Sequence, residues 1–352
     1  MPAADMRGAI LLSIPRYILY LILLGYLPSL SVQAQGMDVD PFHVRNMNPF
    51  ALIYGMPAAS SSRLLAERDS SLQLTADVAN NSIESDSDGE RIRLDGETYR
   101  LALIWQRGLA SDWQIGIELP FLFHRDGVMD GLIENWHDFF SLSNSDREDW
   151  PRNSLVYRYE NSEGEQILVD RKSSGIGDIV LSLSRALGAD RDSNRRMALH
   201  TSLKLPTGDA DELLGSGALD LAFWISASDR WKLWQWPLNL YGQAGVLLKG
   251  EGDLLEDLQE DLVLFGTLGV GWRPEEWIDL KAQVDTHSSH YDSELDQLGG
   301  AAIMLTVGGS LHLDGDSRRI DISIGENLTT DSVPDFMINL AYVQRFTTSL
   351  KE

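Results

Sequence analysis

The chain has 352 residues, of which 29 are Lys or Arg and 53 are Asp or Glu, and its formal net charge is −24. This acidic balance excludes a nucleic-acid-binding protein, because phosphate backbones are bound by surfaces rich in Lys and Arg. The absence of cysteine excludes disulfides, thiolate metal sites and a lipid anchor on an amino-terminal cysteine. The fold must therefore be stabilised by backbone hydrogen bonds and packing alone.

Residues 1–34 are organised like a secretory signal peptide. Arg7 and Arg16 precede the apolar run Ile18–Leu27, and small residues lead to Ala34. That run is shorter than the roughly 20 residues that a membrane-spanning helix needs, so an anchoring helix is the less favoured interpretation. We expect export from the cytoplasm and cleavage near Ala34.

Residues 35–70 form a leader with three prolines between Pro41 and Pro57. Prolines at this spacing exclude both a long helix and a central strand. Two interpretations remain open, a periplasmic extension or a small plug in the mouth of a barrel. The apolar side chains of Phe42 and Tyr54 are unusual for a free tail and favour the plug.

Residues 71–346 contain a series of segments in which apolar and polar residues alternate. In one of them, Leu101 and Leu103 alternate with Arg100 and Ala102, which is the period of two that a β-strand requires. We count about twelve such segments, at residues 72–78, 99–105, 113–121, 179–184, 196–205, 219–226, 238–249, 262–272, 278–285, 303–311, 320–324 and 336–346.

These segments predict an all-β fold, a transmembrane antiparallel up-and-down β-barrel of about twelve strands. No apolar run of about 18 residues follows residue 34, and an open sheet edge cannot lie in hydrocarbon, so only a closed barrel could span a bilayer. The connections alternate between long and short, as the outer loops and periplasmic turns of such barrels do. The long connections cover 81–97, 125–173, 206–216, 250–260, 289–300 and 327–335, and the short ones cover 109–112, 187–194, 229–232, 274–275 and 314–318.

A soluble β-sandwich or lipocalin-like barrel would also have alternating strands. Its polar face would be solvated, whereas here that face often carries Gly, Ala or Ser beside single charges. Trp and Tyr also recur at strand ends, as in the aromatic girdles of membrane barrels. We therefore favour a barrel in the outer membrane of a Gram-negative bacterium, surrounded by lipid and lipopolysaccharide.

The connection 125–173 is too long to be structureless in a compact protein, and we expect a large external loop there. Apolar residues from Val128 to Phe140 recur at helical spacing and predict a short amphipathic helix. Further on, Leu155–Tyr159 and Gln166–Asp170 flank a turn and predict a hairpin. The loop is either a cap that packs over the barrel mouth or a lid with a binding surface.

The last predicted strand, Phe336–Phe346, begins and ends with an aromatic residue. Such a strand resembles the signal that bacterial barrel-assembly machinery recognises, and this machinery is an expected partner. The C-terminal tail 347–352 follows the strand, which leaves open whether Phe346 alone provides the signal.

Five motifs carry a resemblance to a known family. They are RNMNPFALIYGMP at Arg45–Pro57, WHDFF at Trp136–Phe140, GIGD at Gly175–Asp178, KLPTGD at Lys204–Asp209 and GSGALD at Gly215–Asp220. Together they resemble the DUF3187 family of uncharacterised Gram-negative outer-membrane proteins, over nearly the whole mature chain. KLPTGD and GSGALD are less specific, being similar to motifs of other barrels, including proteins linked to aromatic-compound degradation. The resemblance implies a location and a fold but no activity.

Charged residues on the polar face of the strands are expected to line the barrel lumen. Such side chains either fill the lumen as paired charges or leave a narrow path, in which cations would attract anions. The candidates are Arg100, Glu118, Asp178, Arg196, Lys204, Asp220, Asp279, Lys281, Asp285 and Arg345.

A barrel enzyme is one alternative to a pore. His287 and Ser289 have the spacing of a histidine and a nucleophilic serine on one strand, as in outer-membrane phospholipase-like enzymes. Their parity places both side chains inward, whereas a lipid-hydrolysing site must face the bilayer, and no third member follows. We therefore expect no catalytic residue.

Neither a metal nor a cofactor is expected. The acidic loop clusters lack a fixed ligand spacing, and the chain has no Gly-rich phosphate loop and no HExxH motif. We expect passive passage or binding of a small molecule that the sequence does not identify. A lipase-like enzyme and a non-conducting structural barrel are the alternatives.

Overall fold

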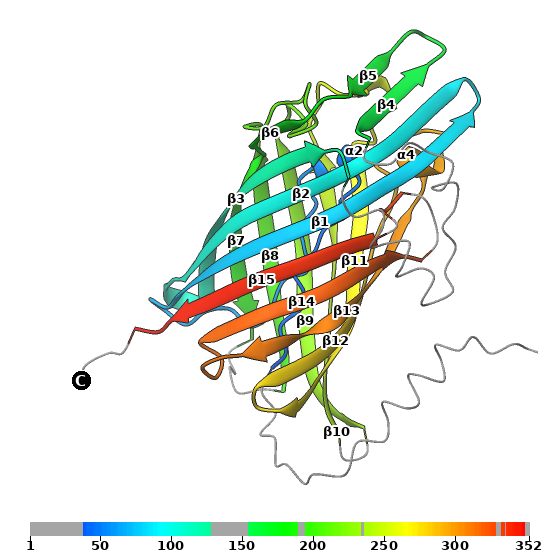
Figure 1. The fold of residues 1–352 in the computed structure, drawn as a ribbon. Helices are drawn as coiled ribbons and strands as arrows, with labels where there is room; N and C mark the ends of the chain where they lie inside the picture. The colour runs from blue at the N-terminus through cyan, green and yellow to red at the C-terminus, as the bar shows by residue number, and fades with distance from the viewer. Residues whose placement is uncertain are drawn as a thin grey trace, which may run out of the picture.

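The computed structural model describes residues 38–127, 154–188, 194–233, 236–328, 332–334 and 336–348. Within these residues, twelve long strands form a closed antiparallel barrel (Figure 1). Their bounds are β1 Ser70–Ser87, β2 Glu90–Gly108, β3 Trp113–Arg125, β7 Ile179–Leu187, β8 Arg195–Leu205, β9 Asp220–Leu233, β10 Trp236–Lys249, β11 Leu262–Glu275, β12 Ile278–His287, β13 Ala302–His312, β14 Arg318–Asn327 and β15 Phe336–Phe346.

Each of these strands pairs with its neighbours along the chain, and β15 pairs with β1 from Ser70↔Phe346 to Asn80↔Phe336. This last ladder leaves the barrel without an open edge, as a lipid environment requires. The predicted all-β, up-and-down barrel of about twelve strands is therefore confirmed.

Shorter elements lie at the ends of the barrel. They are the strands β4 Val156–Asn161, β5 Gln166–Val169 and β6 Ser173–Ile176, the helices α2 Pro49–Leu52 and α4 Asp296–Gly299, and the 3-10 turns η1 Ala110–Asp112 and η3 Glu256–Leu258. The strands β4 and β5 form the predicted hairpin, and β6 pairs with β3 in line with β7. The predicted helix 128–140 and the rest of residues 128–153 lie outside the described residues. Among the described residues, no helix reaches the length and apolar character needed to cross a bilayer.

The outer surface of the barrel is apolar. Leu268 on β11 and Leu340 on β15 expose 76% and 47% of their surface, although they lie near the middle of their strands, and Leu74, in the part of β1 that pairs with β15, exposes 52%. Trp236 and Trp272 stack with ring centroids 4.9 Å apart where β9, β10 and β11 end. An apolar band bordered by aromatic residues is the surface that a membrane barrel presents to lipid.

One predicted loop is a pair of strands. Residues 81–97 were expected to be a long loop, but β1 and β2 continue through them as one hairpin with the turn Asp88–Gly89. Both turn residues have positive φ, +46° and +87°, as a type I′ turn requires. Figure 1 shows this hairpin extending beyond the barrel rim beside β4 and β5. The loop prediction was wrong because Asp-Gly between polar residues still forms a tight turn.

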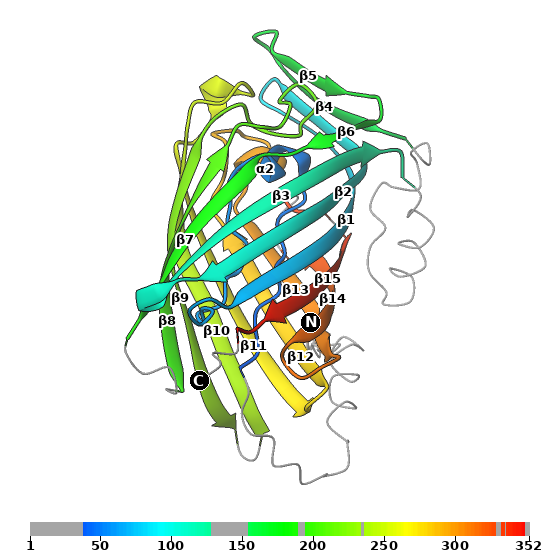
Figure 2. The ribbon, with the colours of Figure 1, turned by 90° about the vertical axis from the view of Figure 1, so that its left-hand side faces the viewer.

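The leader lies inside the barrel. From Asp38 it runs from the end with the short turns (the turn end) towards the end with the long connections (the loop end), where it forms α2, and it then returns to β1 (Figure 2). Pro49 occupies the first turn of α2, and the Asn48 side chain caps this helix by accepting a hydrogen bond from the Phe50 amide at 3.0 Å.

Apolar side chains cover α2 at the loop end. We call this cluster the loop-end cap. Its buried residues come from the leader, the β1–β2 hairpin, the β4–β5 hairpin and three long connections. They include Phe50, Ile53, Tyr54, Ile92, Leu94, Leu155, Tyr157, Tyr159, Val169, Leu213, Leu254, Leu255, Tyr291, Leu295 and Leu298.

Candidate functional site

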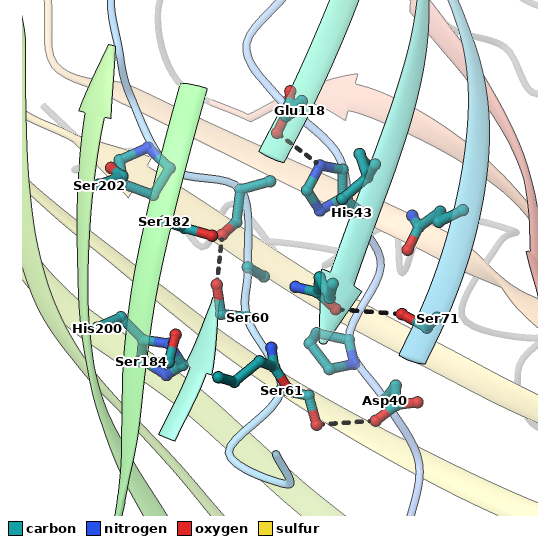
Figure 3. Close-up of a pocket in the computed structure, with 18 of the residues that line it drawn as sticks. Asp40, His43, Ser60, Ser61, Ser71, Glu118, Ser182, Ser184, His200 and Ser202 are labelled. Carbon is teal, nitrogen blue, oxygen red and sulfur yellow. Dashed lines mark hydrogen bonds and ion pairs between the residues drawn. The ribbon is translucent and has the colours of Figure 1, made fainter. Parts of the chain in front are cut away.

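A cavity of about 140 Å³ lies between the leader and one side of the barrel wall (Figure 3). On the wall side it is lined by residues of β1–β3, β7–β9, β14 and β15, and on the other side by leader residues 40–65. Towards the turn end it borders a second cavity of about 420 Å³, since Arg63, Leu65 and Arg345 line both. Towards the loop end it stops at Arg45 and Glu118, above which the loop-end cap begins.

The cavity exists in part because several inward residues on this part of the wall are small. Gly116 on β3 faces Ser182 on β7, and a Cβ atom at Gly116 would lie only 2.6 Å from the Ser182 Oγ. Ser184 on β7 and Ser202 on β8 continue the same surface. Small hydroxyl side chains leave space between the wall and the leader that longer side chains would fill.

Paired charges close the loop-end side of the cavity. The Arg45 Nη2 of the leader lies 3.0 Å from both carboxylate oxygens of Glu118 on β3. Arg100 on β2 also donates to Glu118, and the His43 Nε2 lies 3.6 Å from it. The Glu118 carboxylate therefore bonds the leader to the wall and is neutralised there.

A second charge cluster lies at the turn-end side. The Asp40 carboxylate of the leader accepts hydrogen bonds from Arg319 on β14 and, at 2.5 Å, from Arg345 on β15. Burial raises the pKa of this carboxyl, but the positive charges of Arg345 and Arg319 outweigh burial and hold the pKa well below its usual range. Asp40 is therefore ionised at neutral pH and holds the start of the leader against the wall.

The opposite wall, around β12, binds the leader closely, and the described cavity on this side measures only about 30 Å³. Gln283 on β12 accepts from the Phe42 amide at 2.9 Å and donates to the Phe42 carbonyl at 3.2 Å, as a neighbouring strand would. The Lys281 Nζ donates to the Asp40 carbonyl at 3.1 Å and lies 3.9 Å from the centroid of the Phe42 ring. The leader thus packs directly against this side, whereas on the other side it is bonded to the wall at Glu118 and Asp220 and leaves open space between these contacts.

Four of the family motifs meet at one point of the loop end, which we call the motif cluster. It consists of Asp178, Lys204, Ser216, Asp220 and Gly55. Asp178 of GIGD accepts from the Lys204 Nζ of KLPTGD at 2.6 Å and from the Ser216 amide of GSGALD at 3.1 Å. Asp220 accepts from the Gly55 amide of the leader at 2.7 Å and lies 3.2 Å from the Lys204 Nζ. The motif cluster therefore joins the residue that precedes β7, the strands β8 and β9, the connection between these two strands, and the leader.

The ten predicted lumen-lining residues all have polar or charged partners inside the barrel. Besides the contacts above, Arg196 pairs with Asp38, Asp279 pairs with Arg273 and with the His312 Nε2 at 2.8 Å, and Asp285 accepts from Thr267 and Gln283 at 2.6 and 2.9 Å. Lys281 also lies 3.6 Å from Asp321. The structure therefore brings together charges that the sequence could only place on the same face.

The weak catalytic candidates His287 and Ser289 lie at the loop end of β12, where His287 contacts the leader. The His287 Nε2 lies 3.0 Å from the Asn46 Nδ2 of the leader, and the Nδ1 lies 2.8 Å from the Ser288 carbonyl. His287 serves to hold the leader.

The prediction did not include the neutral residues of the cavity, Ser182, Ser184, Ser202, Gln73 and Trp224. Their inward parity was readable from the sequence. Their role as the lining of a cavity could not be read from the sequence. It depends on the path of the leader, which leaves a space beside these residues and fills other parts of the lumen.

A closed barrel with an apolar exterior and a polar, leader-containing lumen is an integral outer-membrane β-barrel. Among solved structures, the chain is similar to an outer membrane channel of Pseudomonas putida F1, at 13% identity and a TM-score of 0.50, over 81% of this chain and 98% of that chain. Lower TM-scores link it to the NanC porin (0.42, 10% identity, 79% and 100% covered) and the toluene transporter TodX of Pseudomonas putida (0.35, 10%, 89% and 99%). At these identities the likeness concerns the fold alone.

The family model described as "Protein of unknown function (DUF3187)" matches residues 18–346. The chain therefore belongs to the DUF3187 family, as the motifs indicated. No curated protein sequence matches it at a significant level.

Proposed function

We propose that this protein is a gated channel for a small solute, and that the leader acts as a plug inside the barrel. The observation that supports this proposal is the asymmetric position of the leader. Hydrogen bonds from Lys281 and Gln283 hold it against β12 with little space between them, whereas a polar cavity separates part of the leader from β1–β3 and β7–β9. Such a cavity is the beginning of a path across the barrel.

Contacts between the leader and the barrel wall explain why the path would be closed at rest. Arg45 and Glu118 block the cavity towards the loop end, and the loop-end cap covers α2 beyond them. Passage therefore requires the leader to move. The turn-end side is wider, and in a barrel whose short turns are periplasmic it would face the periplasm.

Removing the leader tests this proposal. We expect a variant that lacks residues 38–65 to show a severalfold larger single-channel conductance in planar bilayers than the full chain, because deletion empties the lumen. Heat-modifiable migration in detergent gels establishes that both proteins are folded. A folded, leader-free barrel that passes no current would overturn the channel and leave a non-conducting structural barrel.

A crosslink tests the movement of the leader separately. The Ser62 Oγ of the leader lies 2.7 Å from the Ser228 Oγ on β9, and the chain has no other cysteine to interfere. We expect the oxidised double variant Ser62→Cys/Ser228→Cys to show fewer openings than the full chain, and a reductant to restore them. The single variant Ser62→Cys is the matched control and should not respond to reductant. Openings that are equally frequent with and without the crosslink would contradict gating by the leader.

A further inference from the structure

We infer that the cavity binds a small, uncharged, hydroxylated solute, of about the size of glycerol. This inference rests on the cavity that the proposed channel uses, and it names the chemical class that the cavity would hold. It does not require that the solute crosses the membrane.

The charges around the cavity argue against an ionic ligand. At the loop-end side, Glu118 is paired with Arg45 and Arg100. At the turn-end side, Asp40 is paired with Arg319 and Arg345, and Arg63 lies 3.7 Å from Asp38 and 3.6 Å from Asp316. An anion or a cation entering the cavity would compete with these pairs and would be desolvated without a partner of its own. The site that we propose is therefore the neutral part of the cavity, and not the anion-attracting lining that the sequence suggested.

The middle of the cavity is neutral and rich in hydroxyl groups. Ser182, Ser184 and Ser202 line it on the wall side, and the Ser184 Oγ lies 2.8 Å from the His200 Nδ1. The other ring nitrogen of His200 lies 2.7 Å from the Ser226 Oγ, so neutral hydroxyls occupy both nitrogens. Hydroxyl side chains donate and accept hydrogen bonds, as the hydroxyl groups of a polyol do.

Two donors at the cavity have no hydrogen-bond partner within the described structure. They are the indole Nε1 of Trp224, a residue only 6% exposed, and the side-chain Nε2 of Gln73. Both residues line the cavity. A buried N–H group without a partner carries its full desolvation cost, which an acceptor oxygen of a ligand would offset. Hydroxyl oxygens can serve as those acceptors without adding charge.

The volume limits the size of the ligand. The cavity measures about 140 Å³. A protein cavity of about 150 Å³ is known to hold benzene, which has about six non-hydrogen atoms. Glycerol has the same number of heavy atoms, and three hydroxyl groups. A disaccharide would exceed this volume and would extend into the adjoining cavity at the turn end.

The Trp224 indole provides a direct test. In protein labelled with ¹⁵N-tryptophan and held in detergent micelles, we expect glycerol to shift the Trp224 indole N–H resonance saturably. The variant Trp224→Phe identifies this resonance. The indoles of Trp231 and Trp277, which are 55% and 57% exposed, are internal references and should show no saturable shift. We expect glycerate, which carries a charge, to bind at least tenfold more weakly than glycerol.

A cavity-filling variant locates the binding site. We expect Ser202→Leu to weaken the glycerol response at least tenfold, because the larger side chain occupies the cavity. Its neighbour Thr201 has the opposite strand parity and faces outward, so Thr201→Leu is the matched control and should leave the response unchanged. The absence of a saturable shift in the natural protein would overturn the inference, as would a response to glycerate as strong as that to glycerol, or an undiminished response in Ser202→Leu.

These outcomes are separable from those of the channel test. Glycerol binding without conductance in the leader-free barrel would contradict transport and support the binding site. Conductance without glycerol binding would support the channel and contradict the binding site.

Discussion

Buried charged residues in the lumen lie beside residues of opposite charge. Lys204, which is 2% exposed, lies between Asp178 and Asp220 at 2.6 and 3.2 Å. Asp178 also accepts from the backbone amides of Thr207 and Gly208 at 2.9 and 2.8 Å. Gly215 is required beside it, because a Cβ atom there would lie 2.4 Å from the Asp178 Oδ1. One lysine thus contacts two buried carboxylates that organise the loop end, and its positive charge compensates one of their two negative charges.

Removing this lysine should be costly. We expect Lys204→Met to lower the free energy of unfolding by about 3 kcal/mol, because it leaves two buried carboxylates without their cation. The measurement is urea-induced unfolding of the protein in lipid vesicles. Lys172 forms an exposed ion pair with Asp126 at 2.7 Å, so Lys172→Met is the matched control, with an expected change below about 1 kcal/mol. Equal effects of the two variants would refute a structural role for the motif cluster.

At the scale of elements, the β1–β2 hairpin connects the membrane barrel to the loop-end cap. Its outer half pairs with β4, where Ile92 lies opposite Tyr159 and Leu94 opposite Tyr157. All four of these side chains are almost completely buried. The hairpin therefore continues the sheet past the barrel rim and provides part of the apolar cover over α2.

The turn of this hairpin can be tested on its own. Gly89 has a positive φ, which β-branched residues avoid, so we expect Gly89→Val to destabilise the outer half of the hairpin by about 1–3 kcal/mol. Hydrogen–deuterium exchange should then be faster at residues 82–95 and unchanged in the barrel strands.

The matched variant for this turn is Asp88→Asn. Asn-Gly also favours a type I′ turn, so exchange should stay at the natural rate. Faster exchange in both variants, or in neither, would show that turn geometry does not control this region.

At the scale of the whole molecule, the exterior and the lumen have opposite chemistry. Leu268 near the middle of β11 is 76% exposed to the outside, whereas neighbouring positions with inward parity, such as Thr267, are buried and hydrogen-bonded. This arrangement is inverted relative to a soluble barrel. Lipid must cover the apolar band, and the leader fills much of the polar interior.

Because lipid covers the apolar band, the effect of a charged substitution on the free energy of unfolding should depend on its depth in the bilayer. We expect Leu268→Arg to lower the free energy of unfolding in lipid vesicles by about 2–4 kcal/mol, the cost of a charge near the bilayer midplane. Leu233 at the end of β9 is also exposed, and Leu233→Arg should cost only about 0–1 kcal/mol because the end of the strand lies at the interface. A cost at Leu233 as large as at Leu268 would contradict this placement in the bilayer.

Some of the candidate site was accessible from the sequence. The inward direction of Lys204, Glu118 and Arg345 follows from the parity of their strands. The pairing of Asp178 with Lys204 and Ser216 did not follow, although their motifs were recognised, because parity gives a direction and not a partner. The turn at Asp88–Gly89 could have been recognised from its residue types alone.

The sequence by itself determined the number of strands, the faces of their side chains and the apolar exterior, because these depend on local alternation with a period of two. The tertiary structure decided what fills the lumen. Closure of the barrel brings together residues that are far apart in the chain, such as Asp40 and Arg345, which are separated by 305 positions. The path of the leader, the cavity beside it and the partner of each buried charge depend on these contacts, and no local pattern encodes them.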